Sequence, residues 1–213
     1  MNIGRTALIL AALALLAGCG NDTSKPNLAG TTVQRITAKI SGKDEAQPLP
    51  TADQLRAAVT PEFRAQSGNL PLLLASSLRL PVSSIMVQAG VNGGVRTYFP
   101  PDGISFALRD GILVASRGLG TDLMSADVSQ VLPRVRAGSG EAVREHHYLD
   151  GENQEVVRRY RCRYARAGAE VVESCTGEDT SFENRYVLRG GRIAVAAQWV
   201  SPQLGSYRLE DLG

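Results

Sequence analysis

Beyond residue 70 the chain alternates short runs of β-branched, aromatic and other apolar residues with turn signals made of Gly, Asn, Asp and Pro. Runs of this length, bounded in this way, are typical of β-strands. Tight turns join neighbouring runs, which favours antiparallel pairing of consecutive strands. The pattern therefore predicts a mainly β domain of about ten antiparallel strands, arranged in hairpin meanders as a curled sheet, a sandwich or a half-open barrel.

The strongest hairpin signal is Asp110-Gly111, which separates "ISFAL" from "ILVASR". An Asp-Gly pair suits the type I′ turn that joins antiparallel strands through two residues. Gly190-Gly191 separates two further runs, "FENRYVLR" and "RIAVAAQWV", in the same way. We expect both pairs of runs to form hairpins.

One to three short helices are expected outside these strands. Thr51 and Gln54 stand three residues apart ahead of apolar positions, as a capping box requires, and Thr60-Pro61 is typical of a second helix start. Residues 121–136 read as a loop or as a short helix that Pro133 interrupts.

The N-terminus has the pattern of an export signal. Arg5 precedes an apolar run over residues 7–17, which is too short to span a bilayer. Leu16-Ala17-Gly18-Cys19 resembles a bacterial lipobox, in which cleavage leaves the cysteine as an acylated N-terminus. We therefore expect a signal peptide over residues 1–18, a diacylglycerol and an N-acyl chain on Cys19, a flexible tether over 19–50 and a single β-rich periplasmic domain over 51–213. Gly20 rather than Asp after the cysteine favours the outer membrane.

The charge balance excludes one class of partner. The chain carries 23 basic and 21 acidic side chains, and removal of the signal peptide takes away only Arg5 among them. A nearly neutral domain offers no general electrostatic attraction for nucleic acid.

Cys162 and Cys175 form an even pair in the oxidising compartment that the lipobox implies. If they face each other in a hairpin, the same register places Gly168-Ala169 at the tip, where Gly suits the first position of a type II′ turn. Counting outward from the tip makes the cysteines a non-hydrogen-bonded pair, whose short Cα separation allows a disulfide. Free thiols or a metal or redox site are the alternatives. They are less favoured, because zinc needs four ligands and no C-x-x-C motif is present.

Five arginines surround Cys162, and three of them share one face of the strand: Arg159, Arg161 and Arg163. In the predicted register this face lies opposite Glu178, Thr176 and Ser174. It is either a solvated face with one cross-strand ion pair or a basic strip for an anionic polymer, such as an acidic polysaccharide or lipopolysaccharide.

Catalytic, metal and cofactor motifs are weak. His146 and His147 are adjacent, so a regular strand would point them to opposite faces and no single metal could bind both. G-x-S-x-G and H-E-x-x-H are absent. Gly118-Leu119-Gly120 superficially resembles a dinucleotide-binding loop, but Leu123 stands where a third glycine belongs and a hairpin precedes it. We expect these glycines to serve positive φ or close packing instead.

The lipobox and the run "VRTYFPPDGISFALRDGILVASRGLGTDL", residues 95–123, resemble the YjbF/GfcB group of exopolysaccharide and group 4 capsule lipoproteins. The late cysteine pair and the β-rich C-terminal half are similar as well, although members often have Trp where Tyr98 stands. The resemblance implies an outer-membrane lipoprotein needed for polysaccharide production or assembly, and it carries over no catalytic residue.

Together these features predict a periplasm-facing, lipid-anchored outer-membrane protein that supports exopolysaccharide or capsule export. We expect it to bind a polysaccharide secretion protein or an acidic polysaccharide without transforming it, and to need no metal, no nucleic acid and no cofactor besides the lipid on Cys19. A polysaccharide-modifying enzyme and a half-barrel module that handles lipids or lipoproteins are the alternatives.

Overall fold

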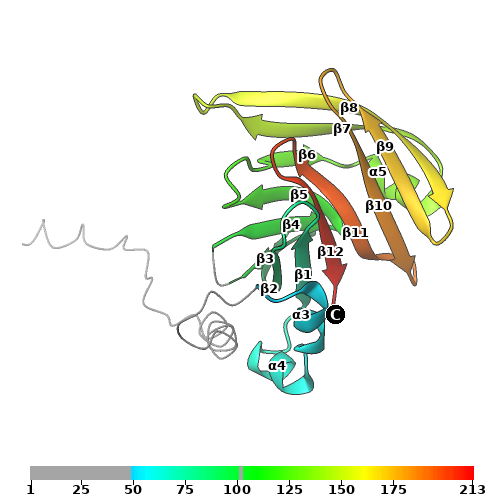
Figure 1. Cartoon of the computed structure of the whole chain (residues 1–213). Coiled ribbons are helices and arrows are strands. Elements are labelled where there is room, and N and C mark those ends of the chain that lie inside the picture. Colours follow the sequence, from blue (N-terminus) through cyan, green and yellow to red (C-terminus); the bar gives the residue numbers. More distant parts are fainter. Residues whose placement is uncertain (1–48, 101–102) are drawn as a thin grey trace, which may run out of the picture.

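A computed structural model describes residues 49–100 and 103–213 (Figure 1). The predicted signal peptide, the lipidation site Cys19 and the tether up to residue 48 lie outside these residues. Within these two ranges there are three short helices: α3 (Ala52–Ala57), α4 (Pro61–Gln66) and α5 (Val131–Ala137). No helix in the described part of the chain is long and apolar enough to cross a membrane.

Twelve strands make up the rest of the fold. In chain order they are β1 (Leu72–Ser77), β2 (Ser83–Asn92), β3 (Val95–Phe99), β4 (Ser105–Arg109), β5 (Ile112–Arg117), β6 (Ser125–Asp127), β7 (Gly140–Leu149), β8 (Glu155–Ala167), β9 (Glu170–Thr176), β10 (Ser181–Arg189), β11 (Arg192–Ser201) and β12 (Gly205–Asp211).

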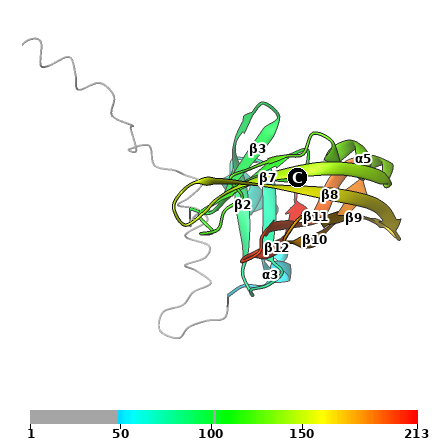
Figure 2. The same cartoon turned by 90° about the horizontal axis from the view of Figure 1, so that it is seen from above.

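All twelve strands belong to one antiparallel sheet, in the order β5-β4-β3-β2-β1-β12-β11-β10-β9-β8-β7-β6. The sheet curls until its two edge strands, β5 and β6, lie side by side (Figure 1), and Figure 2 gives a view of the curled sheet from above. At this seam the Ser116 amide of β5 donates a hydrogen bond of 2.8 Å to the Leu123 carbonyl, just before β6. The mainly β prediction is confirmed, and its form is a nearly closed, barrel-like sheet.

The two hairpins expected at Asp110-Gly111 and Gly190-Gly191 are confirmed. Asp110 and Gly111 have φ values of 51° and 86°, as a type I′ turn requires. The β4–β5 turn reaches across the interior to β11, where Gln198 accepts a bond of 2.9 Å from the Leu113 amide and donates one of 2.8 Å to the Gly111 carbonyl. These bonds fix the β5 side of the barrel against β11.

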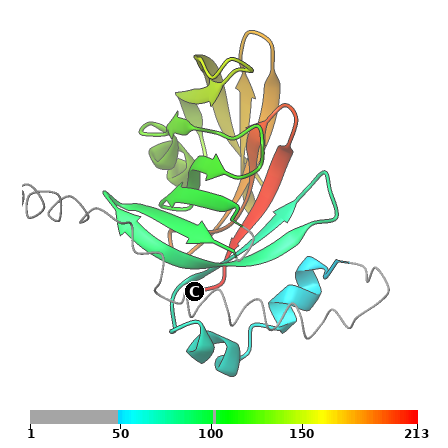
Figure 3. The ribbon, with the colours of Figure 1, turned by 90° about the vertical axis from the view of Figure 1, so that its left-hand side faces the viewer.

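Helices α3 and α4 begin as the sequence predicts. Thr51 and Gln54 form a capping box at α3, and the Thr60 side chain accepts from the Phe63 amide at the start of α4, where Pro61 is the first residue. Both helices lie outside the sheet near β1 and β2 (Figure 3). Their buried side chains, Leu55 and Phe63, form one apolar cluster with the residues of these two strands that point outward, toward the helices.

The prediction for residues 121–136 is corrected. A three-residue strand, β6, precedes α5, and Pro133 lies inside that helix without interrupting it. Pro133 occupies the first turn, where a backbone N–H has no partner within the helix, so its missing donor costs little. Fully buried Val131 and Val135 insert α5 into the end of the barrel, against residues of β5, β8, β10 and β11. This end is called the α5 end below.

Gly118 has φ +84°, and a Cβ there would lie 2.9 Å from the Gly103 carbonyl oxygen. The Asp122 carboxylate accepts from the Gly118 and Leu119 amides. The glycine is therefore needed for a tight turn, as predicted in place of a dinucleotide loop.

Candidate functional site

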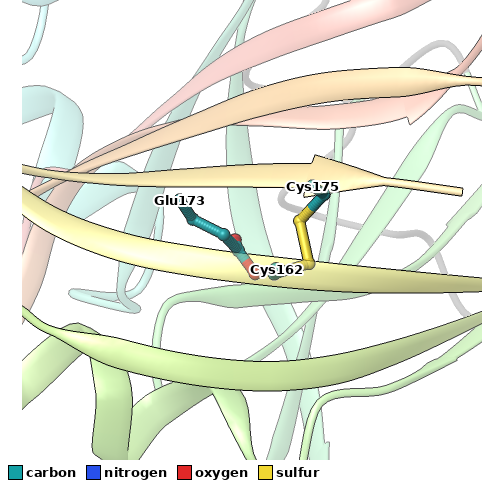
Figure 4. A group of neighbouring side chains, drawn as sticks. All are labelled: Cys162, Glu173 and Cys175. Carbon is teal, nitrogen blue, oxygen red and sulfur yellow. A yellow bond between two sulfur atoms is a disulfide. The ribbon is translucent and has the colours of Figure 1, made fainter.

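The cysteine hairpin has the predicted register. Cys162 of β8 faces Cys175 of β9, and the turn lies at Gly168-Ala169 with φ +62° at Gly168. Both cysteines are buried, with their Cα atoms 4.0 Å apart and their sulfur atoms joined in a disulfide (Figure 4). The hairpin therefore presents its cysteine face to the barrel interior.

A third potential ligand, Glu173, lies beside the two sulfurs, and the three side chains bring their ligand atoms within 4.8 Å of one another. The sulfurs are bonded to each other and so present no thiolate. The carboxylate is engaged as well, because it accepts hydrogen bonds from Arg144, Asn184, Tyr164 and Tyr186. The sulfurs thus serve the disulfide, and the carboxylate belongs to a polar network of the core.

The centre of that network is a buried ion pair. The Arg144 Nη1 atom lies 2.9 Å from Glu173 Oε2, and the two side chains are 2% and 0% exposed. Burial lowers the pKa of Arg144, but the Glu173 carboxylate outweighs it and the net shift is upward. Burial and the same carboxylate raise the pKa of Tyr186, so the tyrosine remains a neutral donor.

The two histidines lie on opposite faces, as the strand period predicts. His146 is buried in an aromatic cluster with Tyr160 and Phe182, and burial, then the Arg144 charge, keep its pKa well below the usual value. His147 lies on the outer face, where a 2.7 Å contact with Glu155 raises its pKa.

The arginine strip lies on the outer face of β8. The predicted facing residues are confirmed for two positions, since Arg161 pairs with Thr176 and Arg163 with Ser174 of β9. The expected neighbour of Arg159, Glu178, lies beyond the end of β9 and outside the ladder. The carboxylates that do pair with the strip come from β7, on the other side of β8.

Two arginines of the strip are ion-paired in this way. Arg159 Nε lies 2.6 Å from Glu145, and Arg163 Nη2 lies 3.3 Å from Glu141. Between them Arg161 faces Val143, which is 45% exposed. No carboxylate of the described residues lies within ion-pair distance of Arg161. The strip therefore has a free positive charge at its centre and a neutralised pair on each side.

Two adjoining hollows run along this face. One, of about 820 Å³, is lined by Arg159 and Arg161 together with Asp127 and Glu178. The other, of about 900 Å³, is lined by Arg161 and Arg163. They share Arg161, Val143, Thr176 and Gln130. We call this continuous surface the arginine groove.

Sequence reasoning identified the arginines of the groove and, on the side of β9, Ser174, Thr176 and Glu178, but it missed the wall on the side of β7. Strand alternation places Glu141, Val143 and Glu145 together on the outer face of β7, so the hairpin register of β7 and β8 contained this signal. Gln130, before α5, was not accessible from the pattern, because a loop brings it to the free edge of β7, where it accepts a 3.4 Å bond from the Val143 amide.

Glu145 of the groove is poorly suited to act as a general acid. A general acid at neutral pH needs a raised carboxyl pKa. The bond from Arg159 instead lowers the pKa of Glu145. The guanidinium of Arg161 offers planar, forked donors to a carboxylate or sulfate, while Val143 provides an apolar surface beside it.

Comparisons with known proteins place the family and the fold of this chain. None of the curated proteins matches the sequence significantly. Among solved structures, the hypothetical lipoprotein YmcC from Escherichia coli K12 superposes with a TM-score of 0.63 at 12% identity, over 89% of this chain and 97% of that one. At this identity the similarity concerns the fold. A family model described as "Group 4 capsule polysaccharide lipoprotein gfcB, YjbF" matches residues 54–212, which is most of the chain, and the protein therefore belongs to the YjbF family.

Proposed function

We propose that this protein supports capsule or exopolysaccharide export as an outer-membrane lipoprotein. In this proposal acylated Cys19 anchors the chain in the outer membrane, and the β-rich domain faces the periplasm. The domain binds an acidic polysaccharide along the arginine groove, without changing it chemically. The observation that carries the proposal is the unpaired Arg161 at the centre of a long groove, in a member of a capsule polysaccharide lipoprotein family.

The groove has properties that an extended anionic chain requires. It is open along its length, so a polymer can lie in it without threading. Arg161 forms no ion pair with a carboxylate of the described residues, so its positive charge is available to a ligand. Arg159 and Arg163 are mostly exposed and can exchange their glutamate partners for ligand carboxylates at little cost, because exposed ion pairs contribute only about 0–1 kcal/mol.

The alternative of a lipid-handling half-barrel has less support. Such a module needs a wide apolar cavity that can receive acyl chains. Here the interior holds fully buried Tyr160, Tyr186, Phe106 and Met86. The Arg144–Glu173 network crosses another part of it. An interior filled in this way favours ligands on the outer surface.

The test combines gene deletion with complementation. Deletion is expected to reduce surface or secreted polysaccharide, and the wild-type gene to restore it. The triple variant Arg159→Ser/Arg161→Ser/Arg163→Ser should fail to restore it at normal protein level, whereas Arg189→Gln, an exposed arginine outside the groove, should succeed. Unchanged polysaccharide after deletion would refute the proposed function. Full complementation by the triple variant would show that the proposed function does not depend on the arginine groove.

Binding in vitro gives the second measurement. The purified chain should retain an acidic capsule polysaccharide on a biosensor, with affinity that falls as salt rises. Arg161→Gln should weaken retention more than Arg189→Gln does.

A further inference from the structure

A second hollow lies at the α5 end of the barrel, apart from the arginine groove. It has a volume of about 80 Å³ and is formed by β1, β3, β4, β11, β12, the β4–β5 turn and α5. This volume is several times the roughly 10–15 Å³ that a cavity needs to admit one water molecule. It can therefore receive one end of a small polar group. We call it the end pocket.

The floor of the end pocket is apolar. Leu73, Leu108 and Leu209 belong to the same buried cluster as Tyr98, and all four line the pocket. Tyr98 is 4% exposed. Burial, then the nearby Asp211 charge, raise its pKa, so its hydroxyl stays protonated. A ligand that enters meets an apolar surface with one phenol.

The rim of the end pocket is rich in arginine. Arg96 of β3, Arg136 of α5 and Arg192 of β11 approach it from three separate elements. Arg192 lies 3.3 Å from Asp211. Arg96 and Arg136 form no ion pair with any carboxylate of residues 49–100 and 103–213. Two forked cations thus face a small hollow without a neutralising partner.

The rim also carries two acceptors, Asp110 and Asp211. Carboxylates accept hydrogen bonds from hydroxyl groups but repel a second anionic charge. A dianionic phosphate would gain from the arginines and lose against both aspartates. A monoanion that also bears hydroxyl groups satisfies both kinds of rim residue, and its C–H surface can lie on the apolar floor.

We propose that the end pocket binds the acidic edge of one uronate sugar residue, with the carboxylate between Arg96 and Arg136 and sugar hydroxyls donating to Asp110 or Asp211. The pocket is closed at its floor, so it takes a chain terminus or a side-chain residue and not a passing polymer. This inference rests on the proposed function for its choice of ligand class.

Helix α5 and the loop before it lie between the two sites. Gln130 lines the arginine groove, whereas Leu132 and Arg136 line the end pocket. A glycan held along the groove could thus place a terminal residue in the end pocket by passing over this helix. The two sites would then bind different parts of the same glycan.

The experiment uses calorimetric or NMR titration of the purified chain with sodium glucuronate, glucose and inorganic phosphate as separate probes. Glucuronate is expected to bind in the millimolar range typical of a single small contact set, with phosphate weaker and glucose weakest. Arg96→Gln/Arg136→Gln should weaken glucuronate binding by about tenfold or more, since each charge-assisted hydrogen bond contributes that order of affinity. Arg189→Gln, an exposed arginine outside both sites, should leave it unchanged.

Four outcomes would overturn the inference. They are no glucuronate binding by the wild type, equal binding by the Arg96→Gln/Arg136→Gln variant, equal binding of glucose, and stronger binding of phosphate. Both replaced arginines are exposed, so the variant should keep the wild-type melting temperature, and Arg136→Lys should partly restore binding. Failure here is distinguishable from failure of the proposed function, which is measured by polysaccharide output and by the groove variants.

Discussion

Replacement of Arg144 by Met tests whether the polar network is a requirement of this fold. The change keeps most of the side-chain length but removes the cation that lies 2.9 Å from Glu173. Three neutral donors, Asn184, Tyr164 and Tyr186, still bond to the carboxylate. They cannot balance its charge, and both partners are almost completely buried. Breaking such a pair from one side costs about 3–5 kcal/mol of unfolding free energy.

The assay is equilibrium unfolding in urea or by heat, followed by circular dichroism. In a domain of this size about 1 kcal/mol lowers the melting temperature by roughly 2–4 °C, so Arg144→Met should lower it by about 6–20 °C. The matched control is Arg163→Met, which breaks the pair with Glu141, whose members are 79% and 72% exposed. That change should cost about 0–1 kcal/mol.

The double variant Arg144→Met/Glu173→Gln separates two contributions to the lost stability: the loss of the Arg144–Glu173 contact and the cost of leaving the Glu173 carboxylate buried without a cation. Glutamine keeps the shape of Glu173 but carries no charge, so the double variant should be more stable than Arg144→Met alone. An Arg144→Met protein as stable as the Arg163→Met control would refute the reasoning. So would a double variant less stable than both single variants combined.

Three further predictions follow from the core. His146 has a depressed pKa and stays neutral in the folded state, whereas in the unfolded chain it takes up a proton below about pH 6.5, so the free energy of unfolding should fall toward acid by up to about 1.4 kcal/mol per pH unit. In urea unfolding between pH 7 and pH 5, His146→Phe should reduce this pH dependence. An unchanged pH dependence would contradict the argument. Gly111→Ala should destabilise more than Gly190→Ala, because both positions have positive φ but only a Cβ at Gly111 meets Ile193, at 2.7 Å; equal melting temperatures would contradict the contact argument. The double variant Cys162→Ala/Cys175→Ala should lose up to about 3 kcal/mol of unfolding free energy. A reductant should lower the melting temperature of the wild type but not of this variant. A wild type whose melting temperature does not respond to reductant would contradict the presence of the disulfide.

Much of the hairpin architecture could be predicted because it is local. Asp110-Gly111 and Gly168-Ala169 fix both the turn and the register of the strands beside them, and strand alternation then assigns each side chain to a face. The pairing of β1 with β12 could not be predicted in this way, since it joins segments more than a hundred residues apart. Without that contact, the sequence left open whether the two meanders form a sandwich or one barrel.

In the candidate site too, local features could be predicted from the sequence and contacts between distant segments could not. Alternation placed the three arginines on one face correctly, yet each strand has two neighbours, and the ion pairs formed with β7 rather than with β9. Glu173 offered a signal that was not used. It lies two residues before Cys175, so a buried cysteine face implies a carboxylate buried on the same side, and such a charge requires a partner. Arg144 holds an inward position of β7 and meets that requirement.

The filled interior bears on how a protein of this shape can serve a polysaccharide. Gln198 ties β11 to β5 across the barrel, α5 inserts Val131 and Val135 into one end, and the Arg144–Glu173 pair occupies a further part of the core. A chain of sugars could pass through this interior only if these contacts broke together, at a cost comparable to the whole stability of a domain. We therefore expect ligands to bind at the surface. Arg161 of the arginine groove and Arg96 and Arg136 of the end pocket have no carboxylate partner among the described residues, and the two sites lie on two sides of the same short helix, α5. If α5 holds both sites in place, a variant that loosens it, such as Val135→Ala, should weaken glycan binding at the groove and glucuronate binding at the end pocket together, whereas the arginine variants should affect one site each.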